Sequence, residues 1–347
     1  MRILEAATRA TATGTHVTLE ALTPGRRRWL ALRRRCTRGD GISPVRSSGV
    51  SDGAAHPSFG PPLSGELLGG LARVDVATTL PLTGGMAHSV WLVTLGDGRR
   101  AVVKTTAGAH KDVYAVEAEG LGTLRAAGGM RTPQVLAAGA GFLVLEAFEP
   151  RSPDDRRFWE CAGRAVAALH GVRGERFGWH RDGWLGRLPQ HNGWSSDGHG
   201  FFAERRLLRY LHEPNVVRVL DASERATVER ICARLPELVP VMPPVLTHGD
   251  LWRGNVVATA GGEPVFVDPA VCWMWAEADL SSMYCSGGAP ACFFDAYREA
   301  RALEPGWRER MPLLHLRELL SSIAHFGPAA SYDLGQVRDT LGPFYQH

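Results

Sequence analysis

The 347-residue sequence lacks the features that mark several common protein classes. It contains no run of roughly 18 apolar residues, which excludes a transmembrane helix, and no apolar stretch near its start that is long enough for a signal peptide. Its six cysteines form no C-x-x-C pair, so neither a disulfide framework nor a zinc site is indicated. These absences predict a cytoplasmic protein with reduced thiols and no membrane partner.

Lysine is almost absent, because only two of the 39 basic residues are lysines, Lys104 and Lys111. A lysine retained against this bias is a candidate for a role that needs a compact ammonium group rather than a guanidinium. The net charge of +3 arises in residues 1–60, which hold ten arginines and four acidic residues. The rest of the chain shows no basic face of the kind that binds nucleic acid, so we expect no nucleic-acid partner.

Residues 1–60 have no sustained hydrophobic periodicity and few aromatic residues, so they are not expected to form a core. A disordered tail, an Arg-rich targeting leader and a start codon placed too early all fit this basic leader. The remaining sequence divides into an N-terminal lobe over residues 61–150 and a C-terminal lobe over residues 151–347. A cleft between the two lobes is the expected place for a site.

The two lobes differ in their expected secondary structure. In the first, the patterns predict strands over 89–95, 101–104, 135–136 and 142–148 and a helix over 112–127. In the second, a long loop rich in Gly, His and Trp is expected over 174–200, and short strands over 245–267. Helices are expected over 155–172, 201–211, 222–235 and much of 293–325. The fold class is therefore α+β, with a small β-rich lobe and a larger helical lobe.

The segment V-L-T-H-G-D-L-W-R-G-N at 245–255 carries the clearest chemical signal. Asp250 and Asn255 have the spacing of the kinase H-R-D-x-x-x-x-N loop, and Asp268 follows the apolar strand V-F-V. Phosphoryl transfer needs a carboxylate to accept the proton of the attacking hydroxyl, and oxygen ligands for Mg²⁺. Asp250 is the candidate catalytic base, and Asn255 and Asp268 are the candidate metal ligands. His248 is expected to orient the loop.

The first lobe supplies the parts that would bind ATP. Lys104 ends an A-V-V-K strand, and Glu117 lies on the following helix, where it could pair with Lys104 and orient it. Glu119 would point to the other side of that helix. Gly84 and Gly85 lie where a loop that covers phosphates belongs. Each signal alone is common in turns and on surfaces, but their order along the chain predicts a nucleotide phosphotransfer site. The motifs of zinc proteases and serine hydrolases are absent.

At H-G-D-L-W-R-G-N the sequence resembles the fructosamine kinase (ketosamine-3-kinase) family, in the aminoglycoside-phosphotransferase branch of protein-kinase-like proteins. The family form is H-G-D-L-W-S-G-N, from which only Arg253 departs. The resemblance covers roughly residues 67–328. Further segments resemble family landmarks: P-L-T-G-G at 81–85, E-A-E-G-L at 117–121, P-Q-H-N-G-W at 189–194, F-F-A-E-R-R-L at 201–207, E-A-D-L at 277–280 and L-E-P-G-W at 303–307.

The resemblance implies a two-lobed kinase-like fold, with an antiparallel N-lobe containing one key helix, and the use of ATP and Mg²⁺. It also implies roles for individual residues. Lys104 would hold the α- and β-phosphates, and the backbone of Glu146 to Phe148 would meet adenine. Trp252, Asn192 and Trp275 would lie near the substrate.

Some positions depart from the family pattern. Trp275-Ala276 stand where the family often has His-Arg, and Asp197-Gly198 replace Asp-Trp. Met86 occupies about the place of a cysteine that could serve redox control in some relatives, so we expect no such thiol switch. The phosphate machinery is intact, whereas the substrate pocket is altered.

The resemblance implies a kinase that phosphorylates a hydroxyl of a ketosamine, such as a fructosamine or ribulosamine adduct on an amine or lysine, leading to deglycation. Because of Trp275-Ala276, a kinase for an aminoglycoside or another amino sugar is an alternative. A catalytically silent nucleotide-binding module is an alternative of a different class. The sequence leaves the sugar, the amine, the regiochemistry and the oligomeric state open.

Overall fold

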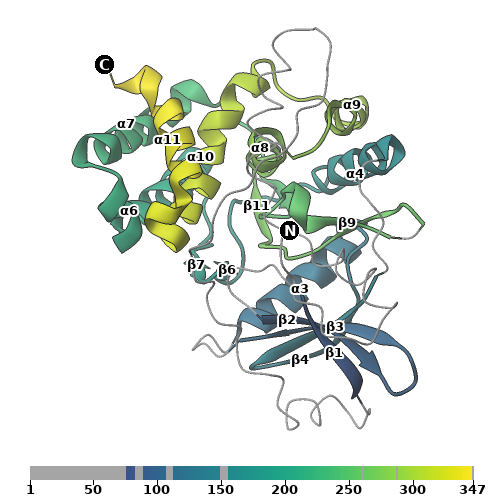
Figure 1. Ribbon diagram of the computed structural model, residues 1–347. Helices are drawn as coiled ribbons and strands as arrows, with labels where there is room; N and C mark the ends of the chain where they lie inside the picture. The colour runs from purple at the N-terminus through teal and green to yellow at the C-terminus, as the bar shows by residue number, and fades with distance from the viewer. Residues whose placement is uncertain are drawn as a thin grey trace, which may run out of the picture.

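A computed structural model describes residues 76–82, 89–106, 112–148, 155–259, 261–286 and 288–345. The basic leader 1–60 and the Gly84-Gly85 loop lie outside the described residues. The chain forms two lobes, with an antiparallel sheet in the first and mostly helices in the second (Figure 1). This is the α+β fold that the sequence predicts.

The N-lobe contains one five-stranded antiparallel sheet and one long helix. The strands follow the order β1-β2-β3-β5-β4, and α3 packs on one face between the sheet and the C-lobe (Figure 1). Its elements are β1 (Val76–Leu82), β2 (Ser89–Leu95), β3 (Arg100–Thr105), α3 (Val113–Ala126), β4 (Val135–Gly139) and β5 (Phe142–Glu146).

Alternation along β3 decides where its lysine points. Val102 packs with Leu121 in the cluster under α3, whereas Val103 belongs to a second cluster on the opposite face. Because successive side chains of a strand point to opposite faces, Lys104 lies on the same face as Val102. It therefore points toward α3.

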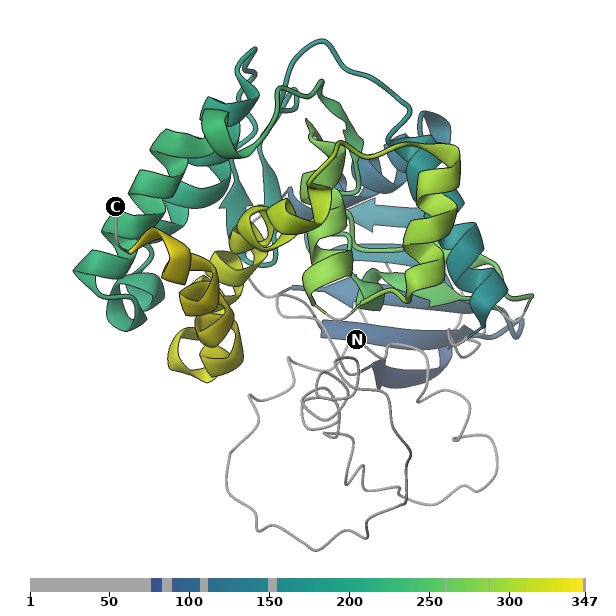
Figure 2. The same cartoon turned by 90° about the horizontal axis from the view of Figure 1, so that it is seen from above.

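The C-lobe holds most of the hydrophobic core. Two groups of helices surround the central strands, α4, α8 and α9 on one side and α6, α7, α10 and α11 on the other (Figures 1 and 2). Its helices are α4 (Arg156–Leu169), α5 (Gly198–Phe202), α6 (Pro214–Val219), α7 (Ala222–Leu238), α8 (Ala276–Cys285), α9 (Ala291–Ala300), α10 (Trp307–Phe326) and α11 (Ser331–Leu341).

Short antiparallel strand pairs carry the loops of the C-lobe. β8 (Val245–Thr247) pairs with β11 (Cys272–Met274), and β9 (Val256–Ala258) pairs with β10 (Pro264–Phe266). The segment between β8 and β9 contains Asp250, and Asp268 lies two residues after the end of β10. The pairing thus brings the two motif loops side by side.

Two predicted elements differ from the structure. The expected loop over 174–200 contains a hairpin, β6 (Gly183–Leu185) with β7 (Leu188–Gln190). The expected helix over 201–211 is one short turn of α5 followed by a π-helical turn and a 3₁₀ turn. Strands of three residues are too short to leave an alternating pattern in the sequence. Among the described residues, none of the helices combines the length and the apolarity that crossing a bilayer requires.

Two helical glycines give a matched test of the fold. A Cβ on Gly163 of α4 would lie 2.2 Å from the Phe293 carbonyl of α9, whereas a Cβ on Gly122 of α3 would meet nothing within 4 Å. We predict that Gly163→Ala lowers the free energy of unfolding by about 1–3 kcal/mol, through overpacking. Gly122→Ala should raise it by about 0.5–1 kcal/mol, because alanine favours the helix. Denaturant unfolding would measure both, and equal effects would contradict this packing.

Candidate active site

Lys104 lies between two carboxylates from different parts of the chain. Its Nζ is 2.5 Å from Glu117 Oε1 on α3 and 2.5 Å from Asp268 Oδ1 in the C-lobe. Lys104 is only 3% exposed. Burial alone would lower the pKa of Lys104, but the charges of Asp268 and Glu117 outweigh it and raise that pKa. Glu119 points elsewhere and accepts a hydrogen bond from the Trp179 indole.

Asp250 and Asn255 contact each other across the tight loop that follows β8. Asn255 Nδ2 donates to Asp250 Oδ2 at 3.0 Å and to the Asp250 carbonyl at 2.9 Å. These bonds engage the amide nitrogen, so the amide oxygen is the atom turned away from Asp250. Burial raises the pKa of Asp250 to about 7, and the carboxylates of Glu318 and Asp268 add to this rise.

Asp279, at the start of α8, holds the loop before Asp250 from behind. Its carboxylate accepts hydrogen bonds from the backbone N–H of His248 at 2.8 Å and of Gly249 at 2.9 Å. His170 lies 3.1 Å away and itself contacts Tyr297. Burial opposes ionisation of Asp279, but the contacts with His170 and His248 lower its pKa. A charged acceptor therefore fixes the two residues that precede Asp250.

The loops of Asp250 and Asp268 touch through their backbones. The Ala270 N–H donates to the His248 carbonyl at 2.8 Å. Gly249 has φ +79°, and a Cβ on it would lie 1.8 Å from the Ala270 carbonyl oxygen, so only glycine fits there. Asp268 also has a left-handed backbone, with φ 58°, a conformation that a short polar side chain tolerates better than most.

These side chains surround one cleft of about 190 Å³. The lining includes the polar and charged groups named above, namely Lys104, Glu117, Asp250, Asn255 and Asp268. The remaining lining comes from α3, from the β6–β7 hairpin, from the residues after Asp268, from Trp252 and from α10: Val113, Val116, Trp184, Leu185, Gly186, Trp252, Pro269, Ala270, Glu318, Ser321 and Ser322.

Among the residues that the structure describes, four predicted site residues do not line this cleft. Asn192 is 1% exposed and its Oδ1 accepts from Arg206 at 2.7 Å. Trp275 is also 1% exposed and packs in the core against Phe202, so the position expected beside the substrate is a packing position here. Both belong to segments whose sequence shows proximity to the site but not the direction of each side chain.

Glu146 and Phe148 lie at the end of β5, outside the cleft lining. The Glu146 backbone N–H donates to the Gln134 carbonyl at 2.9 Å, and the Phe148 ring lies under the Arg131 guanidinium. Their contact with adenine stays a prediction.

The sequence motifs do not indicate that α10 and the β6–β7 hairpin contribute side chains to the cleft. Glu318, Ser321 and Ser322 face the cleft from α10, and Trp184 faces it from β6. One signal was present in the sequence, because Arg317-Glu318 place two charges in a helical pattern over 311–323 that is mostly apolar. A charged pair in such a pattern indicates a buried polar site.

The donor set suits Mg²⁺. Asn255 and Asp268 offer hard oxygen ligands in the same cleft. Among the residues that the structure describes, no three His, Cys, Asp or Glu side chains form a cluster that would hold a metal alone. Mg²⁺ usually needs only one or two carboxylates together with substrate phosphates, so the available ligands fit it.

The family model described as "Fructosamine kinase" matches residues 71–339. A "Probable ketoamine kinase" from Synechocystis is 31% identical over 264 residues, which cover 71% of this chain and 84% of the relative. A crystal structure of a candidate fructosamine-3-kinase from Thermobifida fusca has a TM-score of 0.70 at 32% identity, covering 78% of this chain and 95% of that one.

More distant structures share the fold. An aminoglycoside phosphotransferase, solved in a ternary complex with AMP-PNP and hygromycin B, has a TM-score of 0.54 at 15% identity. It covers 77% of this chain and 94% of its own. Together with the two lobes, this likeness identifies a protein-kinase-like fold.

The buried Lys104 cluster gives a stability prediction. Lys104→Met removes the cation that contacts the buried carboxylate of Glu117 and the partly exposed carboxylate of Asp268, so the free energy of unfolding should fall by about 3–5 kcal/mol. Adding Glu117→Leu should restore much of this loss, because fewer uncompensated charges remain. Denaturant unfolding would measure both variants. The control is Arg99→Ala, which breaks an exposed ion pair with Asp97 and should change stability by less than about 1 kcal/mol. A Lys104→Met effect as small as the control would contradict the burial argument.

Proposed function

The chain belongs to the fructosamine kinase family, and we propose that it transfers the γ-phosphoryl group of ATP to a hydroxyl of a ketosamine, such as a fructosamine or ribulosamine adduct. The observation that carries this proposal is the single cleft that contains Asp250, Asn255, Asp268 and Lys104 together. A catalytically silent module would have no need of a carboxylate in the position of a base.

In the proposed reaction, Asp250 accepts the proton of the attacking hydroxyl. The hydroxyl oxygen forms a bond to the γ-phosphorus, the bond from that phosphorus to the β,γ-bridging oxygen breaks, and ADP leaves. Asp250 must be ionised to act. Its pKa of about 7 means that the ionised form is available at and above neutral pH. The hydrogen bond from Asn255 keeps the carboxylate in one orientation.

Other residues would bind the nucleotide. Lys104 would hold the α- and β-phosphates, and Glu117 would orient the Lys104 ammonium. The backbone from Glu146 to Phe148 would meet adenine, and Gly84 and Gly85 would cover the phosphates. ATP is available in the cytoplasm, which is where this activity is proposed to occur.

Asn255 and Asp268 would hold Mg²⁺, which would neutralise phosphate charge as it develops. Lys104 brings one positive charge against the two negative charges of Glu117 and Asp268, so the cluster has a net negative charge. A net negative charge at this place favours a cation next to the triphosphate.

Another part of the cleft would bind the acceptor. Trp252 and Trp184 offer apolar indole surface for the C–H face of a sugar, and Ser321 and Ser322 lie beside the acidic Glu318. Aromatic, hydroxyl and carboxylate groups together suit a polyhydroxylated amine. Asn192 and Trp275 would act behind this part of the cleft by packing. Loss of the phosphorylated sugar from the amine would then complete deglycation.

The experiment that tests this function is coupled ADP release with Mg²⁺–ATP. Fructoselysine, ribuloselysine, an aminoglycoside and free sugars are compared as acceptors. Turnover of the ketosamines alone is expected. Robust turnover of the aminoglycoside without the ketosamines would favour an amino-sugar kinase, and nucleotide binding without turnover of any acceptor would favour a silent module.

Asp250→Asn is the blank for this assay. We predict that it lowers kcat by about 10²–10⁴-fold, because the amide cannot accept the proton. ATP affinity should stay within about threefold, since Lys104, Asn255 and Asp268 are unchanged. Calorimetric titration of ATP checks the second point, and a large loss of affinity would mean that Asp250 has another role.

Asp268→Asn separates metal binding from nucleotide binding. The affinity for Mg²⁺–ATP should fall by roughly tenfold to a hundredfold, because a charged ligand is replaced by a neutral one. The affinity for ATP in the presence of EDTA should be unchanged or higher, since one negative charge facing the phosphates is lost. Titrations with and without Mg²⁺ measure the two values. Equal changes in both would count against Asp268 as a metal ligand.

A further inference from the structure

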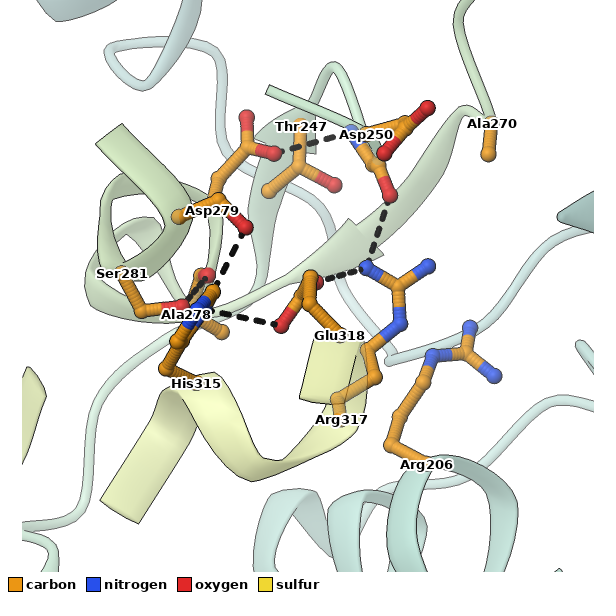
Figure 3. A network of polar contacts seen from close by, with 12 residues as sticks. Arg206, Thr247, Asp250, Ala270, Ala278, Asp279, Ser281, His315, Arg317 and Glu318 are labelled. Atoms are coloured by element: carbon orange, nitrogen blue, oxygen red, sulfur yellow. Dashed lines mark hydrogen bonds and ion pairs between the residues drawn. The ribbon is translucent and has the colours of Figure 1, made fainter. Parts of the chain in front are cut away.

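A buried arginine on α10 contacts the loop that carries Asp250, although none of the motifs includes it. Arg317 is 7% exposed and lies on a helix whose neighbouring positions are mostly apolar. Figure 3 shows its guanidinium pointing toward the backbone of the loop that carries Asp250. Burying a guanidinium is costly unless its hydrogen-bond donors are used, so its partners indicate what it does.

The two ends of the guanidinium contact two different partners. Nη1 donates to the Gly249 carbonyl at 2.7 Å. Nη2 donates to Gln190 Oε1 at 2.7 Å, and Gln190 Nε2 in turn donates to the Ala270 carbonyl at 3.0 Å. Ala270 closes the circuit, because its N–H donates to the His248 carbonyl at 2.8 Å. We call this closed set of contacts the Arg317–Gln190 ring.

The ring connects the two loops that must be aligned for phosphoryl transfer. Gly249 immediately precedes Asp250, and Ala270 follows Asp268 by two residues. Gly249 packs so closely against the Ala270 carbonyl that no free space remains between the two loops there. A shift of one loop therefore passes directly to the other. Misplacement of reacting groups by about 1 Å can cost a hundredfold in rate.

We propose that Arg317 and Gln190 are positioning residues, which hold the loop of Asp250 and the loop of Asp268 in register; this rests on the proposed phosphotransfer function. The competing explanation is that Arg317 only neutralises its neighbour, because Nη1 also lies 2.5 Å from Glu318 Oε1. Under that explanation, Gln190 would have no effect on kcat. The two explanations differ in what Gln190→Met does.

The first measurement is steady-state kinetics of Arg317→Met, Gln190→Met, the double variant and Arg317→Lys. Each single methionine variant should lower kcat by about a hundredfold, with both KM values within about threefold. The double variant should lose no more than the worse single variant, because both break the same ring. Arg317→Lys should recover part of kcat, since an ammonium can reach one acceptor but lacks the fork that spans two.

Arg310→Met is the matched control. Arg310 is on the same helix and makes a similar buried ion pair, with Glu277 at 2.6 Å, but it contacts neither loop. It should lower the melting temperature at least as much as Arg317→Met, while kcat well below that temperature stays within about twofold. Equal losses of kcat in the two arginine variants, a silent Gln190→Met or multiplying effects in the double variant would overturn the proposal.

Hydrogen exchange tests the ring without any acceptor. In Arg317→Met and Gln190→Met, exchange should rise in peptides that cover 248–252 and 268–272, and it should not rise there in Arg310→Met. If wild type turns over none of the acceptors but these peptides respond as expected, the proposed function fails and the ring stands as a structural device. If the peptides do not respond, the ring itself is wrong, whatever the enzyme phosphorylates.

Discussion

The ammonium of Lys104 joins the two lobes, and the geometry of the cleft depends on it. Taking the Lys104 cation and the Glu117 carboxylate out of water costs several kcal/mol per ion, which only close contacts can offset. The contacts with Glu117 and Asp268 therefore require β3, α3 and the loop after β10 to be placed accurately. The apolar cluster between the sheet and α3 supplies this accuracy in the N-lobe. Hydrophobic packing thus sets the position of a charge.

In the C-lobe, two charged side chains hold the backbone of the segment before Asp250. Asp279 accepts two N–H groups of the segment before Asp250, and Arg317 donates to the carbonyl of Gly249 in the same segment. A peptide held at both its donors and its acceptor has little freedom to move. The loop can then be short and free of regular structure and still present Asp250 in one orientation, which a catalytic base needs.

The sequence predicts the parts of this site that depend on short-range spacing. Asp250 and Asn255 lie in one loop, and Lys104 and Glu117 lie on a strand and the helix that follows it, so local geometry fixes each pair. The part of the cleft that would bind the acceptor is different. Trp184 and Glu318 are far apart in the chain, and only the packing of the lobe brings them to the same cleft. Trp275 shows the same limit. A motif places this residue near the site but does not indicate the direction in which its side chain points.

The position of Trp275 changes where substrate preference must be sought. Trp275 packs among aromatic side chains in the core, so its departure from the family pattern does not by itself alter the cleft wall. Under the proposed function, the groups that would face an acceptor come mostly from α10 and the β6–β7 hairpin, together with Trp252, whereas those that would face phosphate come from β3, α3 and the two motif loops. Separate segments thus build the two halves of the reaction. Residues of α10 can therefore change the acceptor while the phosphate chemistry is retained, provided that Arg317 remains in place.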